Sequence, residues 1–215
     1  SALKIEGRYK DANYVALTTQ AYRQAVDEAW AGHALSITPA EELRLEQVYS
    51  RGIGPHFISG TNHQTVVSGR APRHRGVHMG RVTGLTEQSV IIKPDPHSAS
   101  MPLKPGDGVV FDAADWRSPE EPEEGGRIYE MQPRRGGRLE LRFGNHAIDF
   151  DRIRPGDQLW RTHDPDVDKA AKPLTQANSP VHKQRLRVAV TAHEGAPLTT
   201  VWSLTGRPDI TVTVQ

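Results

Sequence analysis

A short pattern occurs twice in the chain and limits how its second half can fold. Leu103–Val110 reads LKPGDGVV and Ile153–Trp160 reads IRPGDQLW, so each copy places Pro-Gly-Asp directly before an apolar stretch. Pro and Gly suit the two central positions of a type II turn, because glycine accepts the positive φ that the second of these positions requires. A turn followed at once by a strand is typical of translation-factor-type barrels. The pattern therefore predicts a β architecture and carries no information about chemistry.

Short strands with turns between them surround both copies of this pattern. Pro133–Gly137 separates two apolar stretches in the way a hairpin turn does. We expect six strands here, at Val77–Val82, Ser89–Lys93, Asp107–Asp112, Ile128–Gln132, Arg138–Phe143 and Gln158–Thr162. This predicts a small, closed or nearly closed barrel over residues 61–163. Ser118–Gly126 is acidic and rich in turn residues, so we expect a solvated loop there.

Two helices are expected before the barrel. Residues 11–31 place apolar or small side chains on one helical face, with an aspartate at the start as N-cap and a glycine after the end. A second helix is expected from Thr38, because Pro39 suits its first position and Glu41 completes a capping box. It should end near Val48.

A second β region is expected after a linker. Asp164–Pro180 shows no periodicity and is interrupted by prolines, so residues 164–184 are interpreted as a linker. The strands expected beyond it are Leu186–Thr191, Leu198–Ser203 and Asp209–Val214, which predict the start of a further β domain over residues 185–215. The predicted fold class is mainly β with N-terminal helices (α+β), a six-stranded translation-factor-like barrel followed by a partial second sheet. Because the chain lacks an initiator Met and ends on a strand, we expect it to be part of a longer protein.

Composition excludes several kinds of site. The 215 residues include no cysteine, which rules out disulfides, thiolate zinc sites, iron–sulfur ligation and cysteine nucleophiles within the chain and fits a cytoplasmic location. A formal net charge of +1 gives no bulk preference for nucleic acid or membranes, and no apolar run approaches the ~20 residues of a transmembrane helix. No G-x-S-x-G nucleophile motif occurs. His74 and His78 are four residues apart, but on a strand they would not converge on a metal, and no carboxylate–histidine motif accompanies them. We therefore expect no catalytic residue and no metal ligand.

Basic residues form two dense groups that are candidate RNA contacts. The first contains Arg73, His74, Arg75 and Arg81, and the second, around the expected hairpin, contains Arg134, Arg135, Arg138 and Arg142. Arginine suits phosphate oxygens and also stacks on bases. The alternative is an ordinary solvated β surface, and the placement of the groups on one face or on opposite faces would distinguish the two. An aromatic content of 6% argues against a platform for stacked bases.

The N-terminal segment resembles a known family. Leu3–Trp30, which reads LKIEGRYKDANYVALTTQAYRQAVDEAW, is similar to the end of the catalytic (β/α) barrel in bacterial U32 peptidases, where a KIEGR strand end leads into the last barrel helix. Tyr49–Gly60 and Arg73–Val82 resemble segments that follow in the same family, as does LKPGDGVVF. The resemblance covers residues 3–112, and over residues 113–215 only the order of the segments and their general residue pattern match. It implies that residues 1–60 hold the end of a catalytic barrel and a connecting helix.

The resemblance also implies a function for a parent protein. The family's cysteine signature lies upstream of KIEGR, so catalysis and any iron–sulfur cluster would belong to that upstream part, and this chain would need no cofactor. Family members were first described as collagenase-like proteases, and relatives with a long C-terminal extension are RNA base hydroxylases. The family motif places Lys4, Glu6, Gly7 and Arg8 at the mouth of the catalytic barrel, where the three charged side chains would share one face.

Three functions remain open at this stage. We expect a non-catalytic accessory region that positions ribosomal or transfer RNA for the upstream catalytic barrel of the same polypeptide. The alternatives are an accessory domain of a collagenase-like protease and a purely structural or dimerisation module. The helix over residues 11–31 carries an apolar stripe suited to covering that barrel, and if exposed it would serve to join two copies as a homodimer. No membrane partner is expected.

Overall fold

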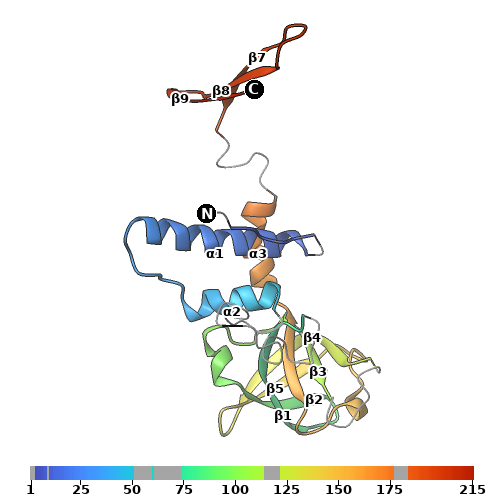
Figure 1. Ribbon diagram of the computed structural model, residues 1–215. Coiled ribbons are helices and arrows are strands. Elements are labelled where there is room, and N and C mark those ends of the chain that lie inside the picture. Colours follow the sequence, from blue (N-terminus) through green and yellow to red (C-terminus); the bar gives the residue numbers. More distant parts are fainter. Residues whose placement is uncertain (1–2, 9, 51–59, 61–73, 114–121, 177–183) are drawn as a thin grey trace. The chain divides into compact units, whose positions relative to one another are not determined.

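A computed structural model describes residues 3–8, 10–50, 60, 74–113, 122–176 and 184–215 (Figure 1). The chain divides into two compact units, Ser1–Thr175 and Gln176–Gln215. The first unit contains the helices α1, α2 and α3 and a β-barrel, and the second contains a three-stranded sheet. None of the helices in the described ranges is long and apolar enough to cross a lipid bilayer.

Helices α1 (Ala12–Trp30) and α2 (Pro39–Val48) form where the sequence predicts them. The Asp11 side chain caps α1 by accepting a backbone N–H of the first turn at 2.8 Å. At α2, Thr38 Oγ1 accepts from the N–H of Glu41 at 3.3 Å, and the N–H of Thr38 donates to Glu41 Oε2 at 2.8 Å. Both predicted caps are confirmed, because each depends only on residues within one helical turn.

Helix α1 buries one side and exposes the other. Leu17 is buried in a small cluster with residues of α3 (Pro165–Thr175). On the exposed side, Tyr22 is 50%, Val26 37% and Trp30 91% exposed. Large apolar side chains grouped in this way are typical of a contact surface. The predicted pairing of this surface with an upstream barrel or a second copy stays a prediction.

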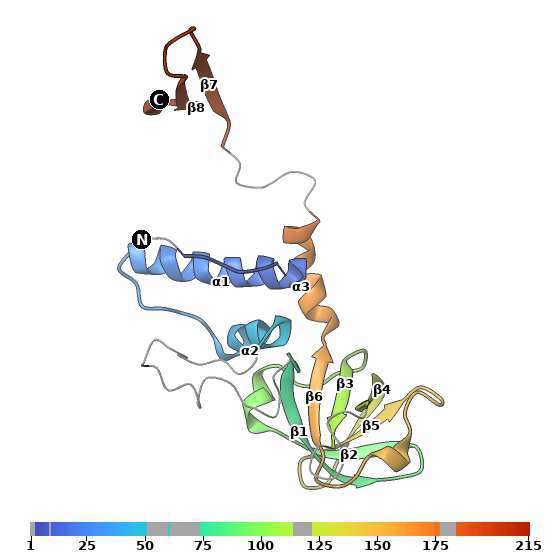
Figure 2. The same ribbon diagram turned by 45° about the vertical axis from the view of Figure 1, so that its right-hand side comes forward.

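Six antiparallel strands close into a barrel in the order β1-β2-β5-β4-β3-β6 (Figures 1 and 2). They are β1 (Val77–Leu85), β2 (Ser89–Pro94), β3 (Gly108–Asp112), β4 (Glu124–Arg134), β5 (Arg138–Phe143) and β6 (Gln158–His163). Each strand contributes at least one side chain that is no more than 1% exposed to a single core, namely Met79, Ile92, Phe111, Ile128, Leu141 and Leu159. All six predicted strands are present. The acidic loop expected over Ser118–Gly126 ends earlier, because β4 already begins at Glu124 and pairs with β3.

The two halves of the barrel repeat one order of elements. In the first half, β1 and β2 are followed by a short 3₁₀ helix, η3 (Pro96–Ser100), a Pro-Gly-Asp turn and β3. In the second half, β4 and β5 are followed by η4 (Phe150–Arg152), the second Pro-Gly-Asp turn and β6. If β1, β2 and β3 are exchanged with β4, β5 and β6, respectively, the barrel keeps the same six pairs of neighbouring strands. The barrel therefore has an internal pseudo-twofold arrangement.

The two Pro-Gly-Asp turns have equivalent hydrogen bonds in both halves. In each turn the aspartate N–H donates to the carbonyl three residues earlier. The N···O distance is 3.2 Å for Asp107 and 3.1 Å for Asp157. The preceding glycines, Gly106 and Gly156, have φ of +96° and +105°, as a type II turn requires. Each glycine N–H also donates at 2.8 Å to a carbonyl of the adjoining strand, β4 in the first half and β1 in the second. The predicted turns are confirmed, and each fixes the start of a strand to its neighbour.

Helix α3 occupies the first part of the segment predicted to be a linker over residues 164–184. That expectation is corrected, because Pro165–Thr175 is helical. Asp164 begins the helix by accepting the N–H of Asp166 at 2.9 Å, and Val167 and Ala171 lie one turn apart and are buried. The prolines suggested an irregular segment, but one of them opens the helix, where proline removes no intrahelical hydrogen bond.

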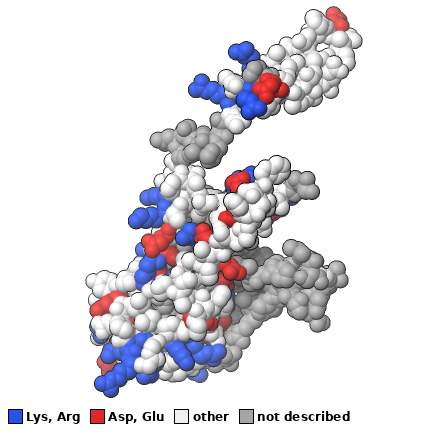
Figure 3. All heavy atoms as spheres, turned by 90° about the vertical axis from the view of Figure 1, so that its left-hand side faces the viewer, with Lys and Arg blue, Asp and Glu red and all other residues white. Residues whose placement is uncertain are grey.

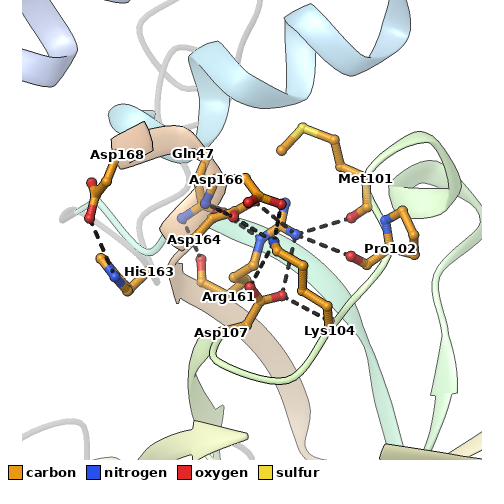
Figure 4. A network of polar contacts seen from close by, with 10 residues as sticks. All are labelled: Gln47, Met101, Pro102, Lys104, Asp107, Arg161, His163, Asp164, Asp166 and Asp168. Carbon is orange, nitrogen blue, oxygen red and sulfur yellow. Dashed lines mark hydrogen bonds and ion pairs between the residues drawn. The ribbon is translucent and has the colours of Figure 1, made fainter. Parts of the chain in front are cut away.

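A buried polar network joins the barrel to the helices (Figure 4). The side chain of Arg161 in β6 is fully buried, and its Nη1 lies 3.6 Å from Asp107 Oδ2 and 3.4 Å from Asp164 Oδ2. Arg161 Nε donates to Gln47 Oε1 of α2 at 2.8 Å, and Gln47 Nε2 donates to the Arg161 carbonyl at 3.0 Å. Lys104 Nζ donates to Asp107 at 3.0 Å and to Asp164 at 2.5 Å.

Burial affects the two carboxylates of this network differently. Burial raises the pKa of Asp107, although Lys104 and Arg161 favour its ionised form. Burial also opposes the ionisation of Asp164, but hydrogen bonds from Lys104 Nζ and from a backbone N–H outweigh it and leave the pKa of Asp164 below its ordinary value. The network thus balances two cations against two carboxylates, and removing one cation would leave a buried charge uncompensated.

The second unit is an antiparallel sheet of β7 (Leu186–Thr191), β8 (Thr199–Leu204) and β9 (Arg207–Val214), at the positions predicted from sequence. Val188, Trp202 and Val212 lie opposite one another across the three strands. They remain 41%, 42% and 59% exposed, so the sheet has an apolar face that is open within this unit.

We predict that Arg161→Met strongly destabilises the first unit. The change leaves Asp107 and Asp164 close together with only Lys104 to compensate them, and loss of one partner of a buried ion pair costs about 3–5 kcal/mol. The free energy of unfolding should be measured by urea denaturation with tryptophan fluorescence. Lys169→Met replaces an exposed cation of α3 and should change that free energy by less than about 0.5 kcal/mol. An Arg161→Met variant as stable as wild type would show that the network contributes no net stability.

Candidate functional site

A row of four cations crosses four neighbouring strands on the outside of the barrel. Arg81 of β1 lies opposite Lys93 of β2, and Arg134 of β4 lies opposite Arg138 of β5. The register of β2 with β5 places Lys93 and Arg138 in adjoining positions, one step beyond the last residue pair of these strands. All four residues are exposed. Because neighbouring strands lie about 4.8 Å apart, this cationic row spans roughly 14 Å.

Most of the cationic row has no acidic partner. Within the described part of the chain, neither Arg81 nor Lys93 makes an ion pair, and Arg138 Nε donates only to the backbone carbonyl of Arg135 at 3.1 Å. Like charges that face each other across a sheet destabilise it. The barrel therefore holds these cations together against their mutual repulsion, and a bound anion would relieve that repulsion.

Arg134 differs from the other members of the row. Its guanidinium forms an ion pair with Glu140, whose side chain is only 3% exposed. A hydrogen bond from Ser89 Oγ at 2.7 Å, together with Arg134, holds the pKa of Glu140 below its ordinary value. Arg134 thus compensates a buried carboxylate, and part of its role is structural.

Two further predicted residues lie beside the row. Arg135 is exposed in the turn between β4 and β5. Arg142 of β5 lies 3.8 Å from Glu130 and 3.6 Å from Glu140, which is within ion-pair distance but beyond hydrogen-bonding distance. On the face shown in Figure 3, Lys and Arg side chains gather over the lower part of the barrel.

Other predicted contacts lie apart from the row. Arg75 is largely buried and forms ion pairs with Asp112 at 2.8 Å and with Glu123, so its charge is already compensated. Arg73 lies outside the described residues. The structure therefore brings Arg81 together with the hairpin arginines and separates it from Arg75. Sequence reasoning missed Lys93, because Ser89–Lys93 reads SVIIK and does not alternate between apolar and polar residues.

His74 has a packing role. Its ring stacks on Tyr49 with 5.3 Å between centroids, and its Nδ1 accepts the N–H of Ser50 at 3.0 Å. Burial lowers the pKa of His74. A ring nitrogen that accepts a backbone N–H must be unprotonated, so both observations favour the neutral ring.

The residues of the family motif lie at the N-terminus, before α1. Lys4 Nζ and Glu6 Oε2 form an exposed ion pair at 2.9 Å, and Arg8 is exposed. A Cβ atom added at Gly7 would lie 2.6 Å from Val15 Cγ2, so glycine allows this segment to pass close to α1. Residues 3–8 form no strand in this chain, so the predicted placement at a barrel mouth stays a prediction.

A polar hollow of about 180 Å³ lies among α1, α2, α3 and the end of β6. Polar groups of this hollow contact one another. Asn13 donates to Asp168 at 2.8 Å. His163 lies 3.5 Å from the same carboxylate, as Figure 4 shows. Among the described residues, no group of three or more side chains could hold a metal ion. The cationic row is therefore the stronger candidate site.

Residues 1–68 match the family model described as peptidase family U32. The match is confined to the N-terminal third of the chain. An uncharacterized protease of Methanocaldococcus jannaschii is 35% identical over 86 residues, which are 38% of this chain and 21% of the relative. The chain thus spans about a fifth of that relative's length, and its barrel begins, at Val77, after the family match. The resemblance found in the sequence is confirmed.

We predict that His74 makes the stability of the protein fall in mild acid. Since burial lowers the pKa of the folded ring, the unfolded chain binds a proton more readily, and stability is lost as pH falls below the ordinary histidine value of about 6.5. His74→Asn keeps an acceptor for Ser50 but cannot titrate. Its free energy of unfolding should therefore fall less than that of wild type between about pH 7.5 and pH 5. His146→Asn, at an exposed histidine, is the control, and equal losses in all three proteins would contradict the prediction.

Proposed function

We propose that this chain is a non-catalytic accessory region of a U32-family protein, and that its barrel positions RNA for a catalytic barrel elsewhere in the polypeptide. The observation that carries the proposal is the cationic row formed by Arg81, Lys93, Arg138 and Arg134. A polyanion that lies across these exposed cations releases the counterions condensed on its own phosphates, which gives a favourable and sequence-independent contribution to binding. The reaction proposed for the whole protein, hydroxylation of a ribosomal or transfer RNA base, rests on the sequence resemblance alone.

The position of the row on strands supports this proposal. Strands of a closed barrel fix the spacing of their side chains, whereas cations on loops could adjust to many partners. Arg81 and Lys93 also have all their charged N–H groups available within the described part of the chain. Guanidinium groups in such a position match phosphate oxygens in charge and in hydrogen-bond geometry.

A second candidate is an accessory domain of a protease, as the name of the similar protein from M. jannaschii suggests. The exposed apolar residues Tyr22, Val26 and Trp30 of α1 favour it, because they could contact a polypeptide. The same residues suit a purely structural or dimerisation role. Neither alternative gives a reason for the cationic row.

We predict salt-dependent RNA binding that requires the row. With three phosphate contacts to a duplex stem, one for each cation of the row other than Arg134, the slope of log K against log salt should be about −3. Lys93→Glu combined with Arg138→Glu should remove most binding, because it deletes two donors and adds repulsion. Neither residue compensates a buried carboxylate, so the fold should be retained. The measurement is fluorescence anisotropy of labelled ribosomal RNA hairpins in a salt series.

The matched control is Lys169→Glu with Lys172→Glu, which makes the same change of net charge on exposed residues of α3. This control should bind RNA nearly as well as wild type. If both double variants lose affinity equally, attraction is non-specific and the row is not a site. Salt-independent binding by wild type would also overturn the proposal.

A further inference from the structure

A bulge in β4 presents one tyrosine to solvent. The pairing of β4 with β5 steps from Ile128 opposite Phe143 to Glu130 opposite Arg142, which leaves Tyr129 as an extra residue. Bulges of this kind turn a side chain to a new direction. Ile128 is 1% exposed whereas Tyr129 is 77% exposed. Within the described residues, Tyr129 makes no hydrogen bond and no ring contact.

Cations lie beside this tyrosine. Arg127 precedes it by two positions on β4, is exposed, and has no ion pair within the described ranges. Arg142 faces the next residue, Glu130, across the pair of strands, and its Nε is buried without a hydrogen-bond partner. Within the described ranges, Arg127 is therefore the accessible unpaired cation beside the exposed ring, whereas the Nε of Arg142 is buried.

The same strand connects this ring to the cationic row. Tyr129 and Arg134 are both outward-facing residues of β4, five positions apart, or roughly 17 Å at about 3.4 Å per residue. β4 thus carries Tyr129 with Arg127 beside it and, further along, Arg134, which is its one member of the cationic row. A charged surface with an interleaved aromatic ring is the arrangement by which proteins hold unpaired nucleotides.

We infer that Tyr129 is a stacking platform for an unpaired base, so that the site takes a single-stranded RNA segment such as a loop or an end. This rests on the proposed function and specifies its substrate class. In a duplex the bases stack on each other and offer no face to a side chain, whereas the bases of loops can be splayed onto aromatic rings. The low aromatic content of the sequence argued against base stacking, but a single ring exposed by a bulge is enough to stack on one base.

The test compares two RNAs of equal length, a hairpin with 2-aminopurine in its loop and a fully paired duplex. Wild type should bind the hairpin more tightly and quench its 2-aminopurine fluorescence. Tyr129→Ala should weaken hairpin binding about 5- to 150-fold, abolish the quenching and leave duplex binding unchanged. Tyr129→Phe should behave as wild type, because stacking needs the ring and not the hydroxyl. Tyr22→Ala, at a half-exposed tyrosine of α1, is the matched control and should change neither RNA.

The double variant Lys93→Glu with Arg138→Glu separates failure of this inference from failure of the proposed function. If that variant loses both RNAs while Tyr129→Ala loses neither, stacking is wrong and the RNA-binding proposal stands. If wild type binds neither RNA, or the double variant binds both as well as wild type does, the proposed function is wrong. Equal affinity of wild type for hairpin and duplex, without quenching, also overturns the inference.

Discussion

Arg161 is the residue through which the barrel and the helices hold each other in place. Removing a guanidinium from water costs several kcal/mol, and only well-placed partners offset this. Its partners come from separate segments: Gln47 of α2, the carbonyls of Met101 at 3.1 Å and Pro102 at 3.5 Å, and two carboxylates. One carboxylate, Asp164, also begins α3. A shift of any of these segments would leave Arg161 without one of its partners, so this single side chain fixes the positions of α2 and of the start of α3 against the barrel.

The pseudo-twofold arrangement shows how this junction differs from the rest of the barrel. In the two copies of the Pro-Gly-Asp pattern, Arg161 occupies the position that Phe111 holds in the other half. Phe111 is a fully buried core residue. The two halves therefore share the backbone hydrogen bonds of their turns, but at this buried position one has an apolar ring and the other a charged group. An apolar residue at this position completes the core, whereas an arginine makes one end of the barrel an attachment point for helices.

Features that depend on adjacent residues could be predicted from sequence. The caps at Asp11 and Thr38 and the turns at Gly106 and Gly156 are set by a few neighbouring residues, so their patterns suffice. Helix α3 was missed because its stability comes from packing against Leu17 rather than from its proline-containing sequence. The helix propensity of the local sequence does not include the free energy of that packing.

The candidate site depends on pairing between strands, which a sequence pattern does not show. Arg75 and Arg81 are close in sequence, yet one compensates Asp112 and the other joins the row. Lys93 becomes part of the site only because β2 lies between β1 and β5. Tyr129 is exposed because of a bulge, which is a property of register and not of composition.

The order in which the chain emerges from the ribosome gives the barrel's topology a further consequence. Gln47 binds the carbonyl of Arg161, 114 residues later, and β1 pairs with β6, so neither α2 nor β1 can complete its contacts until nearly the whole first unit has been synthesised. Contacts this distant in sequence form slowly. The cationic row is also divided between the halves, since Arg81 and Lys93 come from the first half and Arg134 and Arg138 from the second. A nascent chain next to ribosomal RNA therefore carries only half of its own cationic row until folding joins β2 to β5.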